Sequence, residues 1–273
     1  MRIELSAIHA RHPAAPKGRD ALRGVSLALQ PGEQVAVIGP SGAGKTTLLH
    51  VAAAALKPTQ GQLRLDGADP WQLATSALQR QRGRLFLAPQ VPPLPPRQRV
   101  VTAVLAGRLP AWGLMQSLRS LFYPADIPGA HAALDRFGLA DKLFARVDRL
   151  SGGERQRVAL ARALVSPASL WLVDEPLSAL DPTRAEQVIQ TLTQEARERG
   201  ITMLVTMHQV ETALAHFSRI LGLRDGAVAF DLPTAEVTRE RLLQLYAQHE
   251  DELHQPLAGP EAPAAPPVVM HCR

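Results

Sequence analysis

A short glycine-rich segment between an apolar run and an Ala/Leu-rich stretch constrains this 273-residue chain more than any other feature. Val35 to Ile38 is wholly apolar, which is typical of a strand buried on both faces of a parallel sheet. Leu48 to Leu56 predicts a helix that Lys57-Pro58 ends. Between them the chain reads Gly39-Pro-Ser-Gly-Ala-Gly-Lys45-Thr46. This order of strand, turn and helix predicts an α/β fold with a bare backbone loop at the end of a strand.

The segment fits the pattern Gly-x-x-x-x-Gly-Lys-Ser/Thr, and its flanks supply the strand and the helix that this pattern requires. Glycines let consecutive backbone N–H groups face a phosphate, and the helix dipole adds positive potential. We therefore predict a phosphate-binding loop, the P-loop, in which Lys45 reaches the β- and γ-phosphates and the Thr46 hydroxyl binds Mg²⁺. An ordinary glycine-rich turn with an exposed lysine is the alternative. The predicted ATP-binding residues here are Gly39, Pro40, Ser41, Gly42, Ala43, Gly44, Lys45, Thr46 and Thr47.

Two adjacent carboxylates end a second apolar run, Leu170-Trp-Leu-Val-Asp174-Glu175. Open α/β sheets bind ligands at the carboxyl ends of their strands, so this pair is expected near the P-loop. Asp174 would hold Mg²⁺, through water, and Glu175 would orient or deprotonate the water that attacks the γ-phosphate. An acidic pair at an ordinary strand end is the alternative.

The chain contains no asparagine. Guanine-specific GTPases use an Asn-Lys-x-Asp base reader and protein kinases use a catalytic-loop Asn, so neither site can be built here. Adenine is therefore the expected base, and ATP with Mg²⁺ the expected ligands.

Charge and composition limit the class of protein further. The net charge of +5 favours anionic partners but does not choose among them. A single cysteine, Cys272, excludes an internal disulfide and fits a reducing cytosol. The sequence has no apolar run long enough to cross a bilayer and no secretory signal, so a membrane role would be peripheral. The spread of arginines along the chain disfavours a nucleic-acid partner.

Other segments extend the α/β interpretation. We expect a helical insertion after a Pro-stiffened loop that begins at Val91, a hairpin that turns at Asp225-Gly226, and a closing helix over Thr234–Gln248. The remaining predicted strands are Ile3–Ile8, Leu22–Leu29, Gln62–Asp66, Arg84–Ala88 and Ile201–Met207, and a helix is predicted over Thr183–Arg199.

A second candidate anion site begins Leu150-Ser-Gly-Gly-Glu154-Arg-Gln. Ser151 and Glu154 fit a helix capping box, but two glycines at Gly152 and Gly153 are poor helix formers that a cap does not need. A bare backbone there would let phosphate approach the free N–H groups. The segment resembles the signature motif of ABC transporter ATPases.

Other motifs of that family follow the same order along the chain. Gln90 resembles the Q-loop glutamine, Ser178-Ala-Leu-Asp181 the D-loop, and His208 the switch histidine. The resemblance implies catalytic roles for Gln90 and His208 beside Glu175 and Lys45, with Gln90 also a Mg²⁺ ligand. Taken alone, the glutamine and the histidine would be ordinary loop and core residues.

The resemblance implies a fold as well. Residues 1–250 would form an α/β, P-loop NTPase (RecA-like) core with an N-terminal antiparallel β subdomain and a helical subdomain inserted at about 91–160. Residues 251–273 form a Pro-rich tail that we expect to be disordered.

The resemblance also implies a head-to-tail dimer. In that family each ATP lies between one chain's P-loop and the signature segment of the other, so the expected partner is a second ATPase subunit. Family members commonly stack adenine on an aromatic residue ahead of the second strand, where this chain has His12-Pro13. His12 is a hypothetical adenine contact, with a surface histidine as the alternative.

Several segments resemble the phosphonate-importer branch of the family. They are Val104–Leu109, Trp112, Ser117–Phe122, Met207–Val210 and Gly222–Gly226. This resemblance implies integral-membrane permease subunits and a periplasmic phosphonate-binding protein as partners, at the cytoplasmic face of the bacterial inner membrane. Apolar residues in 91–123 suit a membrane subunit's helix, although packing inside the helical subdomain is an equal alternative. An ABC ATPase for another solute, or a soluble one, remains an alternative.

Overall fold

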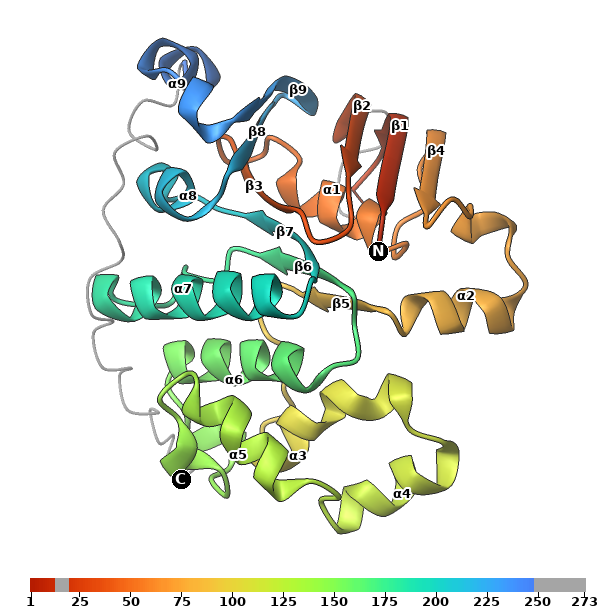
Figure 1. The fold of residues 1–273 in the computed structure, drawn as a ribbon, viewed down its shortest axis with the longest axis vertical. Helices are drawn as coiled ribbons and strands as arrows, with labels where there is room; N and C mark the ends of the chain where they lie inside the picture. The colour runs from red at the N-terminus through yellow and green to blue at the C-terminus, as the bar shows by residue number, and fades with distance from the viewer. Residues whose placement is uncertain (13–19, 248–273) are drawn as a thin grey trace, which may run out of the picture.

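A six-stranded sheet forms the centre of the protein, whose computed structural model describes residues 1–12 and 20–247 (Figure 1). Its strand order is β5-β6-β7-β3-β8-β9, in which β9 alone is antiparallel to its neighbour. The strands are β3 (Gln34–Ile38), β5 (Leu85–Ala88), β6 (Leu170–Asp174), β7 (Thr202–Thr206), β8 (Arg219–Arg224) and β9 (Ala227–Pro233). The continuous burial of β6 and β7 explains why their sequences are nearly all apolar.

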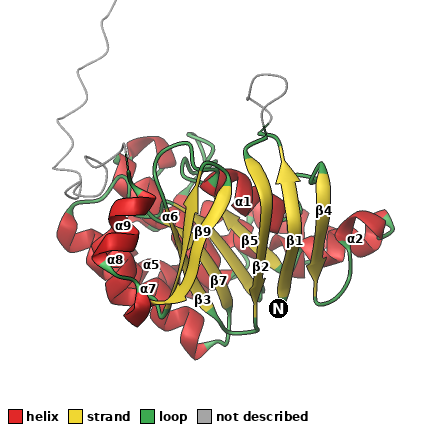
Figure 2. Cartoon of the chain, turned by 90° about the horizontal axis from the view of Figure 1, so that it is seen from above, coloured by secondary structure: helices red, strands yellow, loops and turns green. Residues whose placement is uncertain are grey.

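A smaller antiparallel sheet stands beside the central one (Figure 2). Its strand order is β2-β1-β4, with β1 (Ile3–Ala10), β2 (Leu22–Leu29) and β4 (Gln60–Leu65). Buried and exposed residues alternate along most of β2, which is the pattern of a sheet with one solvated face. The predicted N-terminal antiparallel β subdomain is therefore confirmed.

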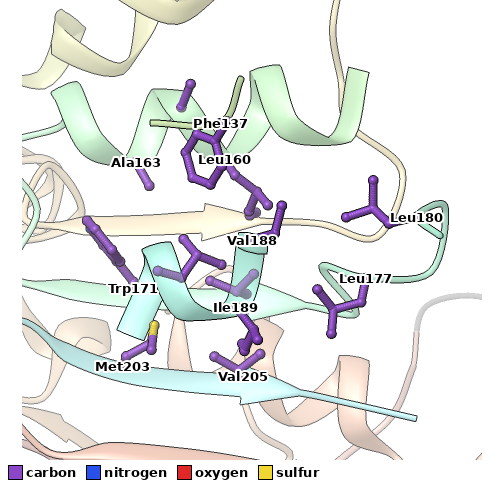
Figure 3. Close-up of a cluster of buried hydrophobic side chains, with 14 of the residues drawn as sticks. Phe137, Leu160, Ala163, Trp171, Leu177, Leu180, Val188, Ile189, Met203 and Val205 are labelled. Carbon is purple, nitrogen blue, oxygen red and sulfur yellow. The ribbon is translucent and has the colours of Figure 1, made fainter. Parts of the chain in front are cut away.

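The alternation of side chains along β3 divides the core into two layers. Val35 and Val37 face α1 (Lys45–Ala52) and the antiparallel sheet, whereas Ala36 and Ile38 belong to the cluster on the opposite face. Figure 3 shows part of that second layer, in which side chains from α6 (Gly152–Val165) and α7 (Pro182–Glu198) meet Trp171 of β6 and Met203 of β7. Close packing on both faces fixes the sheet edge that carries the candidate site.

Between β5 and β6 the chain is helical, and these helices form the lower part of Figure 1. The α-helices are α3 (Val100–Leu105), α4 (Leu114–Phe122), α5 (Ile127–Asp135) and α6; 3₁₀ turns cover Ala106–Ala111, Ala140–Lys142 and Val147–Arg149. Both α3 and α5 pack against α6. The predicted helical insertion into an α/β core is confirmed, and the Pro-rich tail at 251–273 lies outside the described residues.

Two predicted helices have other bounds. α1 begins at Lys45 and ends at Ala52, because the chain turns at Ala54 (φ 50°) and the Leu56 N–H bonds back to His50. In the predicted closing helix, a 3₁₀ turn over Thr234–Glu236 precedes α9 (Arg239–Leu245), which starts where the Thr238 hydroxyl accepts the Arg241 N–H.

Two further helices, α2 (Thr75–Arg82) and α8 (Val210–His216), are not predicted from the sequence. A 3₁₀ turn, Pro70–Gln72, precedes α2. The predicted hairpin is confirmed, since β8 and β9 meet at Asp225 and Gly226, both with positive φ. Across 1–12 and 20–247, every helix is too short or too polar for a bilayer span.

Candidate nucleotide-binding site

The P-loop follows β3 without a break. At Gly39 the backbone takes φ +151°, and a Cβ there would lie 2.0 Å from the carbonyl oxygen of Leu223 in β8. Any side chain at this position would displace the strand, so the loop has to begin with glycine.

The other end of the loop is the N-terminus of α1. Gly44 occupies the N-cap position with φ 102°, and no side chain caps the helix there. Because the first N–H groups of a helix have no partner within the helix, an uncapped start of this kind suits an anion. A Cβ on Gly44 would lie 2.5 Å from the Ala21 carbonyl oxygen. The Lys45 side chain is buried, and its Nζ donates to the carbonyl oxygens of Gly39 at 2.7 Å and Pro40 at 3.3 Å. A helix start of this kind, with an ammonium group folded over it, fits a phosphate group.

Asp174 ends β6 and Thr46 lies in α1, and the two meet although β7 separates β6 from β3, the strand that precedes α1. The Thr46 hydroxyl donates to Oδ2 of Asp174 at 2.9 Å, and the Thr206 hydroxyl donates to Oδ1 at 2.5 Å. Thr206 is at the end of β7, between β3 and β6, and it is completely buried. The carboxylate is thereby held beside the Thr46 hydroxyl as a set of hard oxygen donors, the kind that Mg²⁺ prefers.

Glu175 brings together the two residues that the family resemblance singles out. Its Oε2 accepts the Gln90 amide N–H at 2.6 Å, and its Oε1 lies 2.6 Å from Nε2 of His208. The backbone of Glu175 has φ 46°, and its N–H donates to the carbonyl and hydroxyl oxygens of Thr206. A non-glycine residue in the left-handed region costs roughly 1–3 kcal/mol. The hydrogen bonds from the Glu175 backbone to Thr206, and the contacts of its carboxylate with Gln90 and His208, maintain this strained conformation.

Many of these residues surround one cavity of about 410 Å³, which Gly39, Asp174 and Thr206 do not border. Lys45, Thr46, Gln90, Glu175 and His208 all border it. His12 and Ala21, which precede the P-loop in the sequence, also line this cavity. The structure thus gathers the predicted loop, carboxylate, glutamine and histidine residues around a single space. The predicted residues that line it are His12, Ser41, Gly42, Ala43, Gly44, Lys45, Thr46, Thr47, Gln90, Glu175 and His208.

The signature segment does not line this cavity. Ser151 is the N-cap of α6, where its hydroxyl accepts the Glu154 N–H at 3.2 Å and its own N–H donates to the Glu154 carboxylate at 2.8 Å. The capping box is therefore real. Gly153 has a packing reason too, because a Cβ there would lie 2.8 Å from the Ala179 carbonyl oxygen of the D-loop.

The D-loop residues have structural partners of their own. The Ser178 hydroxyl donates to the backbone carbonyl oxygen of Glu175 at 3.2 Å, which links this loop to the backbone of Glu175. Asp181 caps α7 by accepting the Arg184 N–H at 3.1 Å.

Sequence reasoning missed two residues of the site, Thr206 and Ala21. A hydroxyl at the end of an otherwise apolar strand, two residues before His208, was the available signal for Thr206. Ala21 carries no such signal, because it enters the cavity wall only through the packing of the start of β2 against the P-loop.

Comparison with known proteins identifies relatives over the whole chain. Residues 22–178 match the family model described as ABC transporter. The phosphonates import ATP-binding protein PhnC of a Polaromonas species is 68% identical over all of both chains, and the phosphonates import ATP-binding protein PhnC 2 of Albidiferax ferrireducens is 66% identical over the same extent. A third, from Pseudomonas syringae pv. tomato, is 53% identical over 92% of this chain and 93% of its own.

Solved structures agree with these relatives. The dimeric, post-hydrolysis state of the ATP-binding cassette MJ0796 bound to ADP and Pi superposes with a TM-score of 0.71 at 28% identity. The match covers 85% of this chain and 98% of the cassette. Sequence and fold lead to the same conclusion: the chain belongs to the ABC transporter family, as one of its ATP-hydrolysing cassettes.

Proposed function

We propose that the protein is the ATP-hydrolysing subunit of a bacterial importer for phosphonates. The observation that carries this proposal is its similarity to proteins named as phosphonate import ATP-binding proteins, at 68% and 66% identity over their full length. Because an ATPase core of this fold carries no pocket for the transported solute, similarity over the whole chain is the relevant support for the choice of substrate.

ATP would bind with its phosphates against the P-loop. The uncapped start of α1 and the ammonium group of Lys45 fit the negative charge of the β- and γ-phosphates. The cavity extends to His12, whose ring would stack on the adenine. Thr46 and Asp174, with Gln90, would hold Mg²⁺, which would supply positive charge to neutralise the phosphate oxygens.

Glu175 is the group suited to handle the attacking water. Its carboxylate accepts a hydrogen bond from Gln90 and lies against His208, so its two oxygens have fixed directions toward the cavity. In this arrangement Glu175 orients the water and takes its proton, while His208 and Gln90 hold the carboxylate in place. The strained backbone at Glu175 favours one orientation over others.

A second copy of the chain would complete the site. The signature segment lies outside the cavity that the P-loop lines, so it cannot contact a nucleotide bound in the cavity of its own chain. Its residues are Ser151, Gly152, Gly153 and Glu154. A head-to-tail dimer would bring them onto the partner's γ-phosphate, with the D-loop residues Ser178 and Asp181 at the junction. ATP would then hold two copies together, and hydrolysis would release them, which is a ligand-dependent population shift.

The remaining partners are membrane permease subunits and a periplasmic phosphonate-binding protein, with this chain at the cytoplasmic face of the inner membrane and without a nucleic-acid partner. Exposed apolar side chains on and around α4 support contact with a membrane subunit, since Leu114 is 75% exposed and Met115 82%. Trp112, by contrast, packs partly against the core. The side chains of Leu121 and Phe122 are not among those described.

Reconstitution tests the choice of substrate. The purified complex with its membrane subunits and binding protein, placed in liposomes, should hydrolyse ATP faster when a phosphonate is added on the binding-protein side. Stimulation by another solute alone would replace phosphonate with that solute. ATPase activity independent of the membrane subunits would instead favour a soluble role.

A further inference from the structure

The first residue of the P-loop is fixed by a side chain from the other end of the chain. The N–H of Gly39 donates to the hydroxyl oxygen of Tyr246 at 3.1 Å, and both groups are buried. On the other side of the same residue, the Gly39 carbonyl oxygen accepts Nζ of Lys45 at 2.7 Å. Gly39 is thus held through both of its polar backbone groups, once by Tyr246 and once by Lys45.

Gly39 needs such a restraint. The parallel pairing of β3 with β8 ends at Ile38 and Gly222, so Gly39 is the first residue past the ladder. Its φ of +151° is open to glycine alone, and glycine has more backbone freedom than any other residue. A buried N–H without an acceptor is also costly, so the hydroxyl supplies both a partner and a fixed direction.

The tyrosine is itself firmly placed. Tyr246 directly follows α9 and is 1% exposed, within the same apolar cluster as Leu242 and Leu245. Arg224 at the end of β8 donates to the carbonyl oxygens of Gln244 and Ala247, which ties the end of this helix to the sheet. Figure 1 shows α9 near β8 and β9, and α9 contacts β8. The Tyr246 hydroxyl therefore has a fixed position from which it bonds to the first residue of the P-loop.

We infer that Tyr246 is a positioning residue for ATP binding, which fixes Gly39 so that the Gly39 carbonyl oxygen and the Lys45 ammonium group keep the P-loop in its phosphate-binding shape. The inference rests on the proposed role of the P-loop. Tyr246 does not border the cavity, so it would act through Gly39 rather than by touching the nucleotide.

Tyr246→Phe removes the hydroxyl and keeps the ring. The Kd for Mg-ATP, measured on the full chain by displacement of a fluorescent nucleotide, should rise about three- to tenfold, in line with one lost hydrogen bond. The turnover number should stay within about twofold, because the P-loop contacts the phosphates in the ground state and the transition state alike. Amide exchange of the segment around Gly39 should become faster.

Thr202→Val, in β7, is a matched control, because the Thr202 hydroxyl holds Gly32 just before β3 while Tyr246 holds Gly39 just after it. There the Thr202 hydroxyl accepts the Gly32 N–H at 3.0 Å and donates to the Met1 carbonyl oxygen at 2.7 Å. This variant also loses a buried hydroxyl that holds a glycine next to β3. Both variants should lower Tm by roughly 2–6 °C. The Kd for Mg-ATP should change in the tyrosine variant and remain that of the wild type in the threonine variant.

The three variants distinguish a failure of the proposed role of Tyr246 from a failure of the P-loop assignment. If Tyr246→Phe loses thermal stability but keeps the wild-type Kd, Tyr246 has a structural role only and the inference is wrong. If both variants weaken ATP binding equally, general loosening of the sheet explains the effect and the inference is again wrong. Lys45→Ala is the third arm: wild-type binding in that variant would overturn the P-loop assignment, and the role of Tyr246 with it.

Discussion

The starts of helices α1 and α6 are both candidate phosphate sites, but they are built in opposite ways. At α1 the N-cap is Gly44, and no side chain competes for the first N–H groups. At α6 the N-cap is Ser151, which exchanges two hydrogen bonds with Glu154 in a complete capping box. One helix start thus lacks a side-chain cap and lies beside a buried lysine, while the other is capped by its own residues.

This difference indicates that the two helix starts have different roles in binding phosphate. The start of α1 lies beside the buried Lys45, the carboxylates and the cavity, so under the proposed function it would bind ATP within one chain. The α6 site has only a short hydroxyl and two glycines to offer, and it lies outside that cavity. A hydroxyl that already accepts one hydrogen bond can still donate another, so Ser151 is suited to add a contact to a phosphate that is bound elsewhere. The four variants that follow test this difference in roles.

Glu175→Gln should have the largest effect. The amide keeps the shape of the side chain but cannot accept a proton, so turnover of ATP should fall about 10²- to 10⁴-fold. The Kd for Mg-ATP should change little, since Glu175 borders the cavity without a role in phosphate binding. Single-turnover hydrolysis and nucleotide binding on the same preparation measure both. Turnover at the wild-type rate would remove Glu175 from the mechanism.

Lys45→Ala should weaken Mg-ATP binding about 100-fold, which corresponds to ~2.7 kcal/mol. The change removes a buried positive charge from the start of α1, where the phosphates are expected. Lys57→Ala is the matched control, because this lysine is exposed and follows α1. Equal affinities in the two variants would show that charge alone, anywhere near α1, explains the binding.

Ser151→Asp should uncouple the cap from the phosphate contact. Aspartate is as good an N-cap as serine, so Tm should stay within a few degrees of the wild type. The added negative charge would repel the partner's γ-phosphate, and steady-state ATPase activity should fall about tenfold or more at unchanged Kd for the single chain. Glu154→Ala, in the same segment, breaks the capping box from the other side and should cost about 1 kcal/mol of stability. Loss of activity in proportion to stability in both variants would reduce Ser151 to a cap.

His12→Ala should have the smallest effect, a two- to fivefold rise in the Kd for Mg-ATP, because a stacked ring contributes about 0.5–1 kcal/mol. The exposed His131 on α5 provides the control, and His131→Ala should leave the Kd unchanged. The ratio of the Kd values for ATP and for inorganic triphosphate gives a second measure, since only ATP has a base to stack. An unchanged ratio in the His12 variant would eliminate the adenine contact.

Much of the site could be predicted from local sequence. The P-loop lies between a buried strand and a helix, so a single segment contains both the chemistry and its context. Asp174 likewise ends an apolar strand. The meeting of Gln90 and His208 at Glu175 could be expected only from the family resemblance, because 85 and 33 residues separate them from that carboxylate in sequence.

Other features could not be predicted, for physical reasons. Thr206 matters because β7 separates β3 from β6, and strand order is a tertiary property. The contact of Tyr246 with Gly39 arises because α9 packs against β8, and it joins residues that are 207 positions apart. The polar helix α2 buries none of its residues, so it has no apolar stripe that would predict it. The end of α1 differs from the predicted one because a backbone turn at Ala54 decides it.

Light scattering of Glu175→Gln tests most directly whether two chains share each nucleotide. A shared site predicts a monomer without nucleotide, a dimer with saturating Mg-ATP, and a monomer under both conditions once Ser151→Asp is added to the same chain. A single species that stays monomeric with Mg-ATP, or a double variant that dimerises as readily as the single one, would contradict it.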